Sequence, residues 1–214
     1  MRAVSSFSAK KLILSCISMS TNKQPQHQVR PLPCYDASVE FGDDAEIARH
    51  FNEHGFVVVS NVLAEDEVNA AVEELWTSPT LLGRNSAVSR DNPSSWTTEF
   101  WPQQDGGKNF LESVDAFQDR SCWSLAGNPR VTHVFDLLLQ QRGVDSGAFL
   151  AKAPRWGVMR PTGRHPQWRT LESWLHWDQN PWSQPGFAGV QGFACLAPQT
   201  RTSGGVFCVP GFYK

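Results

Sequence analysis

Two residues of the types that bind iron stand two positions apart in the segment Trp-Leu-His-Trp-Asp at residues 174–178. The aromatic and apolar residues around them predict an extended segment, in which side chains two apart lie on the same face. His176 and Asp178 are therefore expected to project together. An imidazole and a carboxylate are two of the three protein ligands in the facial triad of non-haem Fe(II) oxygenases, which leaves positions for a bidentate co-substrate and O₂. The pair predicts a metal site that still needs a second histidine.

The His-x-Asp spacing is short enough to occur by chance, so the flanking sequence decides its interpretation. The motif continues as Gln-Asn-Pro-Trp, is followed by an apolar run at 190–193, and then by a Gly-Gly turn and a strand ending in Pro-Gly at 203–211. Residues 54–63, His-Gly-Phe-Val-Val-Val-Ser-Asn-Val-Leu, precede an acidic helix. This order resembles the phytanoyl-CoA dioxygenase family of Fe(II)/2-oxoglutarate-dependent dioxygenases, over residues 41–76 and 148–214.

The resemblance implies roles for five residues. His176 and Asp178 would bind Fe(II) and act in catalysis, and Phe193 stands where the family has an aromatic residue near the 2-oxoglutarate co-substrate. Trp156 and Arg160 lie on the expected strand before the motif, where the family contributes co-substrate contacts, although a core tryptophan and a solvated arginine are equally good interpretations. The implied reaction is hydroxylation of an aliphatic C–H bond in a small-molecule substrate that the sequence does not identify.

The resemblance also implies a fold and a departure from it. The expected fold is a double-stranded β-helix, a jelly roll of the cupin type, with N-terminal helices packed outside. The family's second iron-binding histidine and its 2-oxoglutarate-binding arginine are expected tens of residues after Pro210-Gly211, whereas the sequence ends at Lys214. We therefore expect a C-terminally truncated fragment with an incomplete jelly roll, which alone retains iron poorly and is inactive.

Two other functions fit parts of the sequence. Residues 50–54, His-Phe-Asn-Glu-His, match the H-x-x-E-H pattern of inverted zinc peptidases, in which two histidines one helical turn apart bind Zn²⁺ and the glutamate activates water. The match falls at the expected end of a helix, directly before Gly55. The nine tryptophans also suit a noncatalytic β-sandwich module that binds a ligand on an aromatic platform, although a bulky core explains them more simply.

Local patterns predict helices first and strands afterwards. A capping box at Asp43 and Glu46 predicts a helix that stops at Gly55, and apolar residues at helical spacing predict two more, one from Glu65 and one capped by Asn128. Residues 78–127 show no clear periodicity. Strands are expected at 56–59, 148–153, 155–160, 174–178, 190–196 and 206–209. This segregation predicts an α+β fold whose short strands form a sandwich or jelly roll.

Composition restricts the class of protein. With 214 residues, 40% of them hydrophobic and 19% charged, the chain is long enough for one globular core. A net charge of −2 gives no basic footprint for nucleic acid, and no apolar run is long enough for a transmembrane helix. The five cysteines form no C-x-x-C pair, which favours a reducing compartment over a disulfide framework. The oligomeric state is not indicated.

Residues 1–40 are expected to form a disordered leader, and 41–214 a partial dioxygenase-like domain. The first 35 residues are basic and rich in serine, and the first acidic residue is Asp36, a composition typical of an organelle transit peptide. This favours the mitochondrion or the plastid. Two alternatives stay open. The leader could be a disordered segment without a targeting signal, in a cytoplasmic protein, or a secretory signal that begins at Lys10-Lys11.

Overall fold

The computed structural model describes residues 2–4, 11–16, 37–102, 110–111, 119–145, 154–169, 179–180, 182–183, 185–187, 189–200, 203 and 206–211. The chain divides into two units. Unit 1 comprises Met1–Leu63, Pro129–Leu150 and Trp174–Lys214, and unit 2 comprises Ala64–Asn128 and Ala151–Ser173.

Helix α1 (Asp44–His54) of unit 1 begins and ends at the residues that the sequence indicates. The Asp43 carboxylate accepts the Glu46 N–H at 3.2 Å, which satisfies an amide that the first turn leaves unpaired. Gly55 ends the helix in the left-handed conformation, at φ 77°, and donates its N–H to the Phe51 carbonyl at 2.8 Å. The predicted helix is confirmed. Only half of the expected capping box forms, because both Glu46 oxygens accept hydrogen bonds from Arg49.

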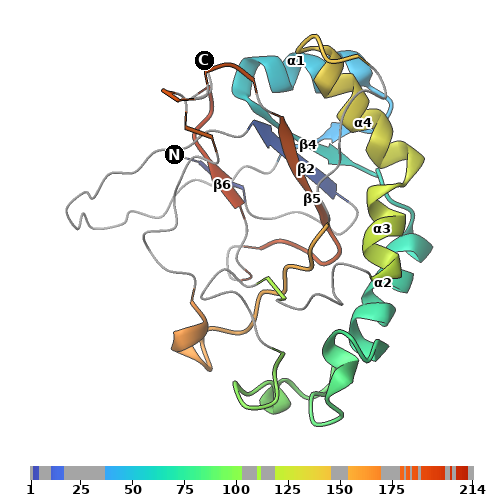
Figure 1. Ribbon diagram of the computed structural model, residues 1–214, viewed down its shortest axis with the longest axis vertical. Helices are drawn as coiled ribbons and strands as arrows, with labels where there is room; N and C mark the ends of the chain where they lie inside the picture. Colours follow the sequence, from blue (N-terminus) through green and yellow to red (C-terminus); the bar gives the residue numbers. More distant parts are fainter. Residues whose placement is uncertain are drawn as a thin grey trace, which may run out of the picture. The chain divides into compact units, whose positions relative to one another are not determined.

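Strand β4 (Phe56–Ser60) follows directly and joins a four-stranded sheet with the order β3-β4-β2-β5. β3 (Val39–Glu40) runs parallel to β4, and β2 (Lys11–Cys16) is antiparallel to both β4 and β5 (Val190–Cys195) (Figure 1). The first four residues of β4 are all buried, as expected of a strand covered on both faces. Helix α1 contacts β4 and buries Ile47 and Phe51 completely.

Two further contacts complete the description of unit 1. Helix α4 (Pro129–Gln140) packs against α1 and buries Val134 and Leu138 completely. A separate antiparallel pair joins β1 (Arg2–Val4) to β6 (Val206–Cys208), and the Gly211 N–H in the turn after β6 donates to the His54 carbonyl at 2.7 Å. The strands predicted at 190–196 and 206–209 are thus confirmed, and so is the helix predicted to follow Asn128.

Strands β1 and β2 differ from the sequence expectation, because they lie within the 40 residues expected to be a disordered leader. β2 lies between β4 and β5, where each of its neighbours pairs with it antiparallel. Its sequence, Lys-Leu-Ile-Leu-Ser-Cys, contains the longest apolar patch of the leader. The transit-peptide assignment and the boundary at residue 40 stay predictions.

In its described residues, unit 2 contains helix α2 (Glu65–Thr77), helix α3 (Arg120–Ala126) and the 3₁₀ turns η1 (Leu82–Arg84), η2 (Pro93–Ser95) and η4 (Pro166–Trp168). α2 confirms the helix predicted from Glu65, and the Glu67 carboxylate accepts the Ala64 N–H at 2.6 Å at its start. α3 packs against α2 and is capped by Asp119, which accepts the N–H of Ser121 at 3.1 Å. α3 was not predicted, because its seven residues are too few to show a helical period.

The strand predicted at 155–160 is wrong. Gly157 makes a single bridge to Phe110, supported by a hydrogen bond of 3.0 Å from the Leu111 N–H to the Trp156 carbonyl. Prolines at 154 and 161 bound the segment, and proline cannot donate to a ladder, so the pairing stops after one bridge. The strands predicted at 148–153 and 174–178 lie outside the described residues.

The described elements form a mixed α+β structure, as predicted, with one small sheet and one strand pair. They do not show a jelly roll, which stays a prediction. Within the described ranges, α2 is the longest helix at 13 residues, and none of the helices is long and apolar enough to cross a membrane.

Gly83 in η1 has no room for a side chain, which gives a test of the packing in unit 2. A Cβ at Gly83 would lie 2.8 Å from the Ser78 carbonyl oxygen and closer still to that of Thr77. Both are backbone atoms, so we expect Gly83→Ala to lower the free energy of unfolding by about 1–3 kcal/mol, measured by urea denaturation. Gly163→Ala is the control, because its Cβ would meet nothing within 4 Å. Equal stability of both variants would contradict the described packing.

Candidate functional site

The structure describes three of the five predicted site residues. His176 and Asp178 lie outside the described residues. Phe193 lies on β5 in unit 1, whereas Trp156 and Arg160 belong to the irregular segment 154–169 of unit 2. The predicted metal pair is therefore not described, and the side chains with chemical potential that are described form separate groups within each unit.

Arg160 is held against aromatic ring faces. Its Cζ lies 4.1 Å from the centroid of the Trp168 ring and 5.5 Å from that of Trp101, within the range of a cation–π interaction. Its Nε is buried without a hydrogen bond, and no carboxylate in the described part of the chain pairs with the guanidinium. Burial lowers the pKa of Arg160 to about 10, so the side chain still carries its charge at neutral pH.

The two tryptophans beside Arg160 are core residues of unit 2. Trp168 is 3% exposed, and its indole N–H donates to the Thr98 hydroxyl at 3.1 Å. Trp101 is 5% exposed and packs against Trp76 and Trp96, with ring centroids 6.4 and 5.5 Å apart. These contacts fix the ring faces on which Arg160 rests. They also support a bulky core, rather than a surface platform, as the role of these tryptophans.

Trp156 is buried in unit 2 close to the capping residue of α3. Burial raises the pKa of the Asp119 carboxyl, and the charge of Glu74 raises it further, whereas hydrogen bonds from the N–H groups of Cys122 and Ser121 oppose the rise. The nearby Trp156 indole N–H also lowers the pKa of Asp119, although this N–H makes no hydrogen bond of regular geometry. Its surroundings are those of a core residue, and a co-substrate contact stays a prediction.

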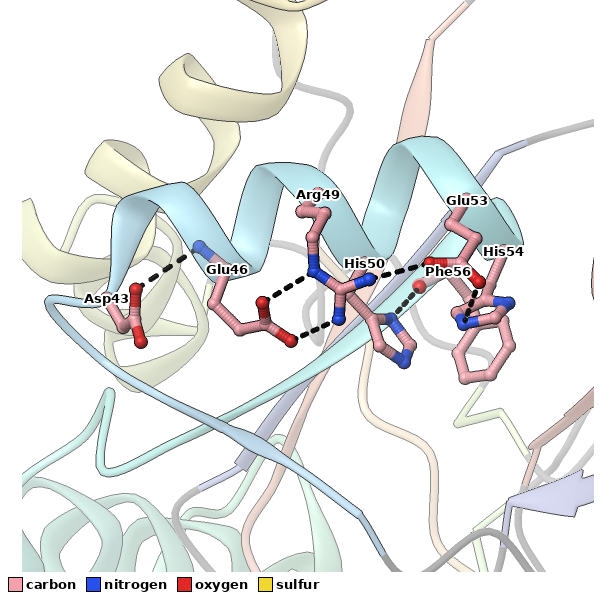
Figure 2. Close-up of polar contacts among 7 residues, drawn as sticks. All are labelled: Asp43, Glu46, Arg49, His50, Glu53, His54 and Phe56. Carbon is pink, nitrogen blue, oxygen red and sulfur yellow. Dashed lines mark hydrogen bonds and ion pairs between the residues drawn. The ribbon is translucent and has the colours of Figure 1, made fainter.

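A chain of polar contacts runs along α1 (Figure 2). Arg49 donates to both oxygens of Glu46, at 2.7 and 2.6 Å, and to Glu53 at 2.7 Å. The hydrogen bond from Arg49 lowers the pKa of Glu46. More than half of the Arg49 side chain is exposed, so solvent screens these ion pairs and their contribution to stability is small.

His50 faces the interior from the same helix. It is 7% exposed, and its Nδ1 lies 2.9 Å from the Phe56 carbonyl oxygen, so Nδ1 carries the proton that this acceptor requires. Burial lowers the pKa of His50, and the charges of His54 and Arg49 lower it further, against the opposing effects of the Phe56 carbonyl and Glu46. The imidazole is therefore neutral at physiological pH.

The H-x-x-E-H match does not form a zinc site in the part of the chain that the structure describes. The rings of His50 and His54 are close, with centroids 4.4 Å apart, but the described ranges contain no group of three or more His, Cys, Asp or Glu that could hold a metal. Glu53 accepts a hydrogen bond from Arg49 and has its other oxygen 3.7 Å from His54 Nε2 (Figure 2). The motif therefore contributes to the end of α1 and its packing on β4.

Phe193 lies on β5, an outer strand of the described sheet, opposite Ile13 of β2. It is 36% exposed, and its neighbours Gln191 and Gly192 are exposed as well. An aromatic ring presented by a regular strand can pack against a planar ligand. The position agrees with the predicted co-substrate contact but does not test it.

Sequence reasoning missed two groups in unit 2. One is the pair of tryptophans that contact Arg160. Trp168 is close to Arg160 in sequence, whereas Trp101 is far from it, so no local motif contains all three residues. The other is a cleft of 460 Å³ between α2 and α3. There the Ser121 hydroxyl donates to Glu74, and the Asn128 amide donates to Glu67 at 2.6 Å. These polar groups satisfy one another, so the cleft shows no chemistry of its own.

Cys122 and Cys208 are poor nucleophiles. Burial raises the pKa of Cys122 to about 12 and that of Cys208 to about 11. Both are therefore thiols at neutral pH, and the thiolate is the reactive form. Neither residue supports a covalent mechanism.

The buried His50 predicts a pH dependence of stability. Its pKa in the folded chain lies below the value of about 6.5 in the unfolded chain, so the unfolded chain takes up the proton first as the pH falls. The stability that neutral His50 contributes is present above pH 6.5 and is lost as the pH falls toward the folded-state pKa. We expect His50→Gln to reduce the loss of unfolding free energy between pH 7.5 and pH 5, measured by urea denaturation.

The control for this measurement is Asn52→Gln, an exposed substitution on the same helix, which should keep the wild-type pH profile. Carboxylates and other histidines titrate in all three proteins, so their contributions cancel in the comparison. Identical pH profiles for the wild type and His50→Gln would contradict the described burial of His50.

One curated protein resembles this chain in sequence. A protein of Dictyostelium discoideum named "Putative phytanoyl-CoA dioxygenase" is 26% identical over 140 residues, which cover 64% of this chain and 37% of that protein. The matched part is thus well under half the length of the relative. No protein-family model and no solved structure matches the chain.

Proposed function

We propose that the protein is an Fe(II)- and 2-oxoglutarate-dependent dioxygenase that hydroxylates a small organic molecule. The observation that carries the proposal is the His176-x-Asp178 pair within an ordered series of flanking motifs. The 26% identity with the Dictyostelium protein supports the same family. Strands β5 and β6 form where the resemblance expects strands after the pair. We propose that they belong to a double-stranded β-helix.

The donor set fits iron. An imidazole and a carboxylate are ligand types that Fe(II) accepts, and the spacing suits one strand. No described group of side chains competes for this role, because the described ranges hold no other cluster with three metal-binding residues. The residue types therefore agree with an iron site, while the site itself involves residues outside the described ranges.

Each residue has a distinct part in the proposed site. His176 would bind iron as a neutral imidazole and Asp178 as a carboxylate, so both must be deprotonated before binding. Phe193 would cover the co-substrate with its ring and exclude water from that side. When bound with 2-oxoglutarate, iron supplies the activation of O₂ for attack on an aliphatic C–H bond. Trp156 and Arg160 stay predictions as co-substrate contacts.

The third iron ligand is not assigned. His133 and His165, two further histidines of the described chain, each make contacts within their own unit. His133 Nε2 lies 2.9 and 3.0 Å from the two oxygens of Asp44, and the ring of His165 lies 4.0 Å from that of Trp168. The contact with Asp44 argues against His133 as the third ligand, whereas the ring contact of His165 does not involve its ring nitrogens.

A noncatalytic binding module is the alternative from another class. The support for this alternative was the number of tryptophans in the sequence. However, Trp101, Trp156 and Trp168 are each at most 5% exposed and cannot form a surface platform. Trp182, at 75% exposed, is a better candidate for a surface contact. The dioxygenase is therefore the better-supported function.

Asp178→Ala tests the metal pair in a chain extended at its C-terminus through the expected second histidine and arginine, because the 214 residues alone are expected to be inactive. Losing the carboxylate removes a direct ligand, so iron affinity should fall by more than the roughly 10–100-fold expected for loss of an outer-shell partner. Anaerobic equilibrium dialysis measures the bound Fe(II), and succinate release from 2-oxoglutarate measures turnover. Both should be lost. Asp91→Asn, at an exposed aspartate, is the control and should retain both. Wild-type iron binding and turnover in Asp178→Ala would remove Asp178 from the site.

Phe193→Ala tests the co-substrate contact. Loss of one aromatic contact should weaken the affinity for 2-oxoglutarate about two- to tenfold, with iron binding unchanged. Titration of 2-oxoglutarate into the iron-loaded, C-terminally extended chain measures this affinity. Gln191→Ala is a matched control, because Gln191 lies two residues away on the same face of β5. Equal affinity in the wild type and Phe193→Ala would exclude Phe193 from the co-substrate site.

A further inference from the structure

The residues that directly follow the proposed metal pair carry no charge. Residues 179–200 contain no aspartate, glutamate, histidine, lysine or arginine, although 19% of the whole chain is charged. The apolar residues of such a stretch are usually buried, whereas Trp182, Ser183 and residues 185–187 are exposed. Exposed apolar side chains beside a reactive group are typical of a site where a ligand binds. The segment 179–187 is therefore a candidate substrate surface.

Gln179 closes this segment into a loop. The residue is 8% exposed, and its Nε2 donates to the Gly186 carbonyl at 2.8 Å. Gly186 adopts a positive φ of 101°, which turns the chain at the point where the loop closes. Because Gln179 is covalently bonded to Asp178, this hydrogen bond holds Gly186 and the following Phe187 near the proposed iron ligand.

A side-chain turn at Asn180 holds the backbone of Trp182. Asn180 Oδ1 accepts the N–H groups of Trp182 at 3.0 Å and of Ser183 at 3.3 Å. The chain from Asp178 to Trp182 spans about 14 Å at most, and a turn of this kind shortens the span. Trp182 is 75% exposed, the largest exposed fraction among the described large hydrophobic residues. A large aromatic ring is thus presented to solvent within reach of a molecule bound beside Asp178.

Phe187 is supported from within unit 1. Cζ of Arg142, just after α4, lies 5.8 Å from the centroid of the Phe187 ring and 5.6 Å from that of the Phe51 ring. Both distances lie within the range of a cation–π interaction. Nε and Nη2 of Arg142 are enclosed by the protein, so this guanidinium is largely directed toward the interior. Phe187 is 37% exposed, and it therefore presents its remaining surface to solvent.

We propose that Trp182 and Phe187 bind the apolar part of an uncharged substrate, and that this substrate is not a CoA thioester. The inference rests on the proposed function, because it takes Asp178 as an iron ligand. The two rings offer apolar surface on which a hydrocarbon chain or ring packs. The phosphates of a CoA thioester bind best to arginine and lysine side chains, and residues 179–200 supply neither.

Two probes with the same alkyl chain and different charge test the substrate class. Octan-1-ol is uncharged, whereas octanoyl-CoA carries the phosphates of CoA. Isothermal titration calorimetry measures their binding to the 214-residue chain in metal-free buffer at constant ionic strength. Octan-1-ol should bind saturably, and octanoyl-CoA should bind no more tightly, because its phosphates gain no ion pair at this surface.

Exposed aromatic residues of the two units provide the variants and their matched controls. Trp182→Ala should weaken octan-1-ol binding about tenfold, because it removes an aromatic contact surface, and Trp182→Phe should restore most of the affinity. The control is Trp123→Ala, at a tryptophan that is 46% exposed on α3 of unit 2, and it should leave the affinity unchanged. Phe187→Ala should weaken binding as well, whereas Phe100→Ala, at a residue 36% exposed in unit 2, should not.

A second measurement locates the bound probe relative to the metal. Mn(II) replaces Fe(II) in the C-terminally extended chain, and NMR measures the relaxation rate of the octan-1-ol methyl protons. Mn(II) is paramagnetic, so it should raise this rate when octan-1-ol binds close to it. Asp178→Ala should remove the effect because Mn(II) loses a direct ligand, and Trp182→Ala should reduce it because less octan-1-ol is bound.

The outcomes separate this inference from the proposed function. Binding of octan-1-ol that depends on Trp182, together with enhanced relaxation by bound Mn(II), supports both. The same binding in a chain that holds no Mn(II) supports the apolar subsite and contradicts the iron site alone. Four results would overturn the inference: no saturable octan-1-ol binding, equal effects of Trp182→Ala and Trp123→Ala, tighter binding of octanoyl-CoA than of octan-1-ol, or bound Mn(II) that leaves the relaxation of bound octan-1-ol unchanged.

Discussion

The direct junction of α1 with β4 at Gly55 is the constraint on which unit 1 depends. Gly55 adopts a left-handed conformation that costs most other residues energy, and the strand begins at the next residue. With no loop between them, α1 must lie on β4, which buries Phe51. The same junction brings His50 within 2.9 Å of the Phe56 carbonyl and leaves the His54 carbonyl to accept the Gly211 N–H. One backbone conformation therefore positions the helix, the buried histidine and the turn after β6.

Elements with local signals were predictable, and elements that depend on distant partners were not. α1 carries its caps and its apolar face in sequence, and α4 carries its apolar face, so both helices follow from short patterns. β2 has only a short apolar patch, and its place between β4 and β5 depends on backbone pairing with segments far away in the chain. The segment 155–160 shows the reverse error, because its aromatic and apolar residues favour a strand but its flanking prolines prevent a ladder.

The candidate site shows the same difference between local sequence patterns and contacts with distant segments. The pairing of His176 with Asp178 is a local pattern, and it stays a prediction because both residues lie outside the described ranges. The H-x-x-E-H match is equally local, yet the described structure uses Glu53 to bind Arg49 and gives the two histidines no third ligand. A pattern of residue types indicates which reactions or metal ions a segment can support. Only the tertiary surroundings decide whether the other ligands are supplied, and no short motif encodes them.

Arg49 and Arg160 show why the net charge of a chain says little about binding of small anions. Arg49 lies on an exposed helix between two glutamates one turn away, so its charge is compensated locally and screened by water. Arg160 has aromatic rings in place of carboxylates and lies where burial lowers its pKa. A charge in such surroundings interacts more strongly with the next charged group, because less solvent screens it. A near-neutral net charge therefore gives no extended basic surface for nucleic acid, but it does not describe the surroundings of a single guanidinium such as that of Arg160.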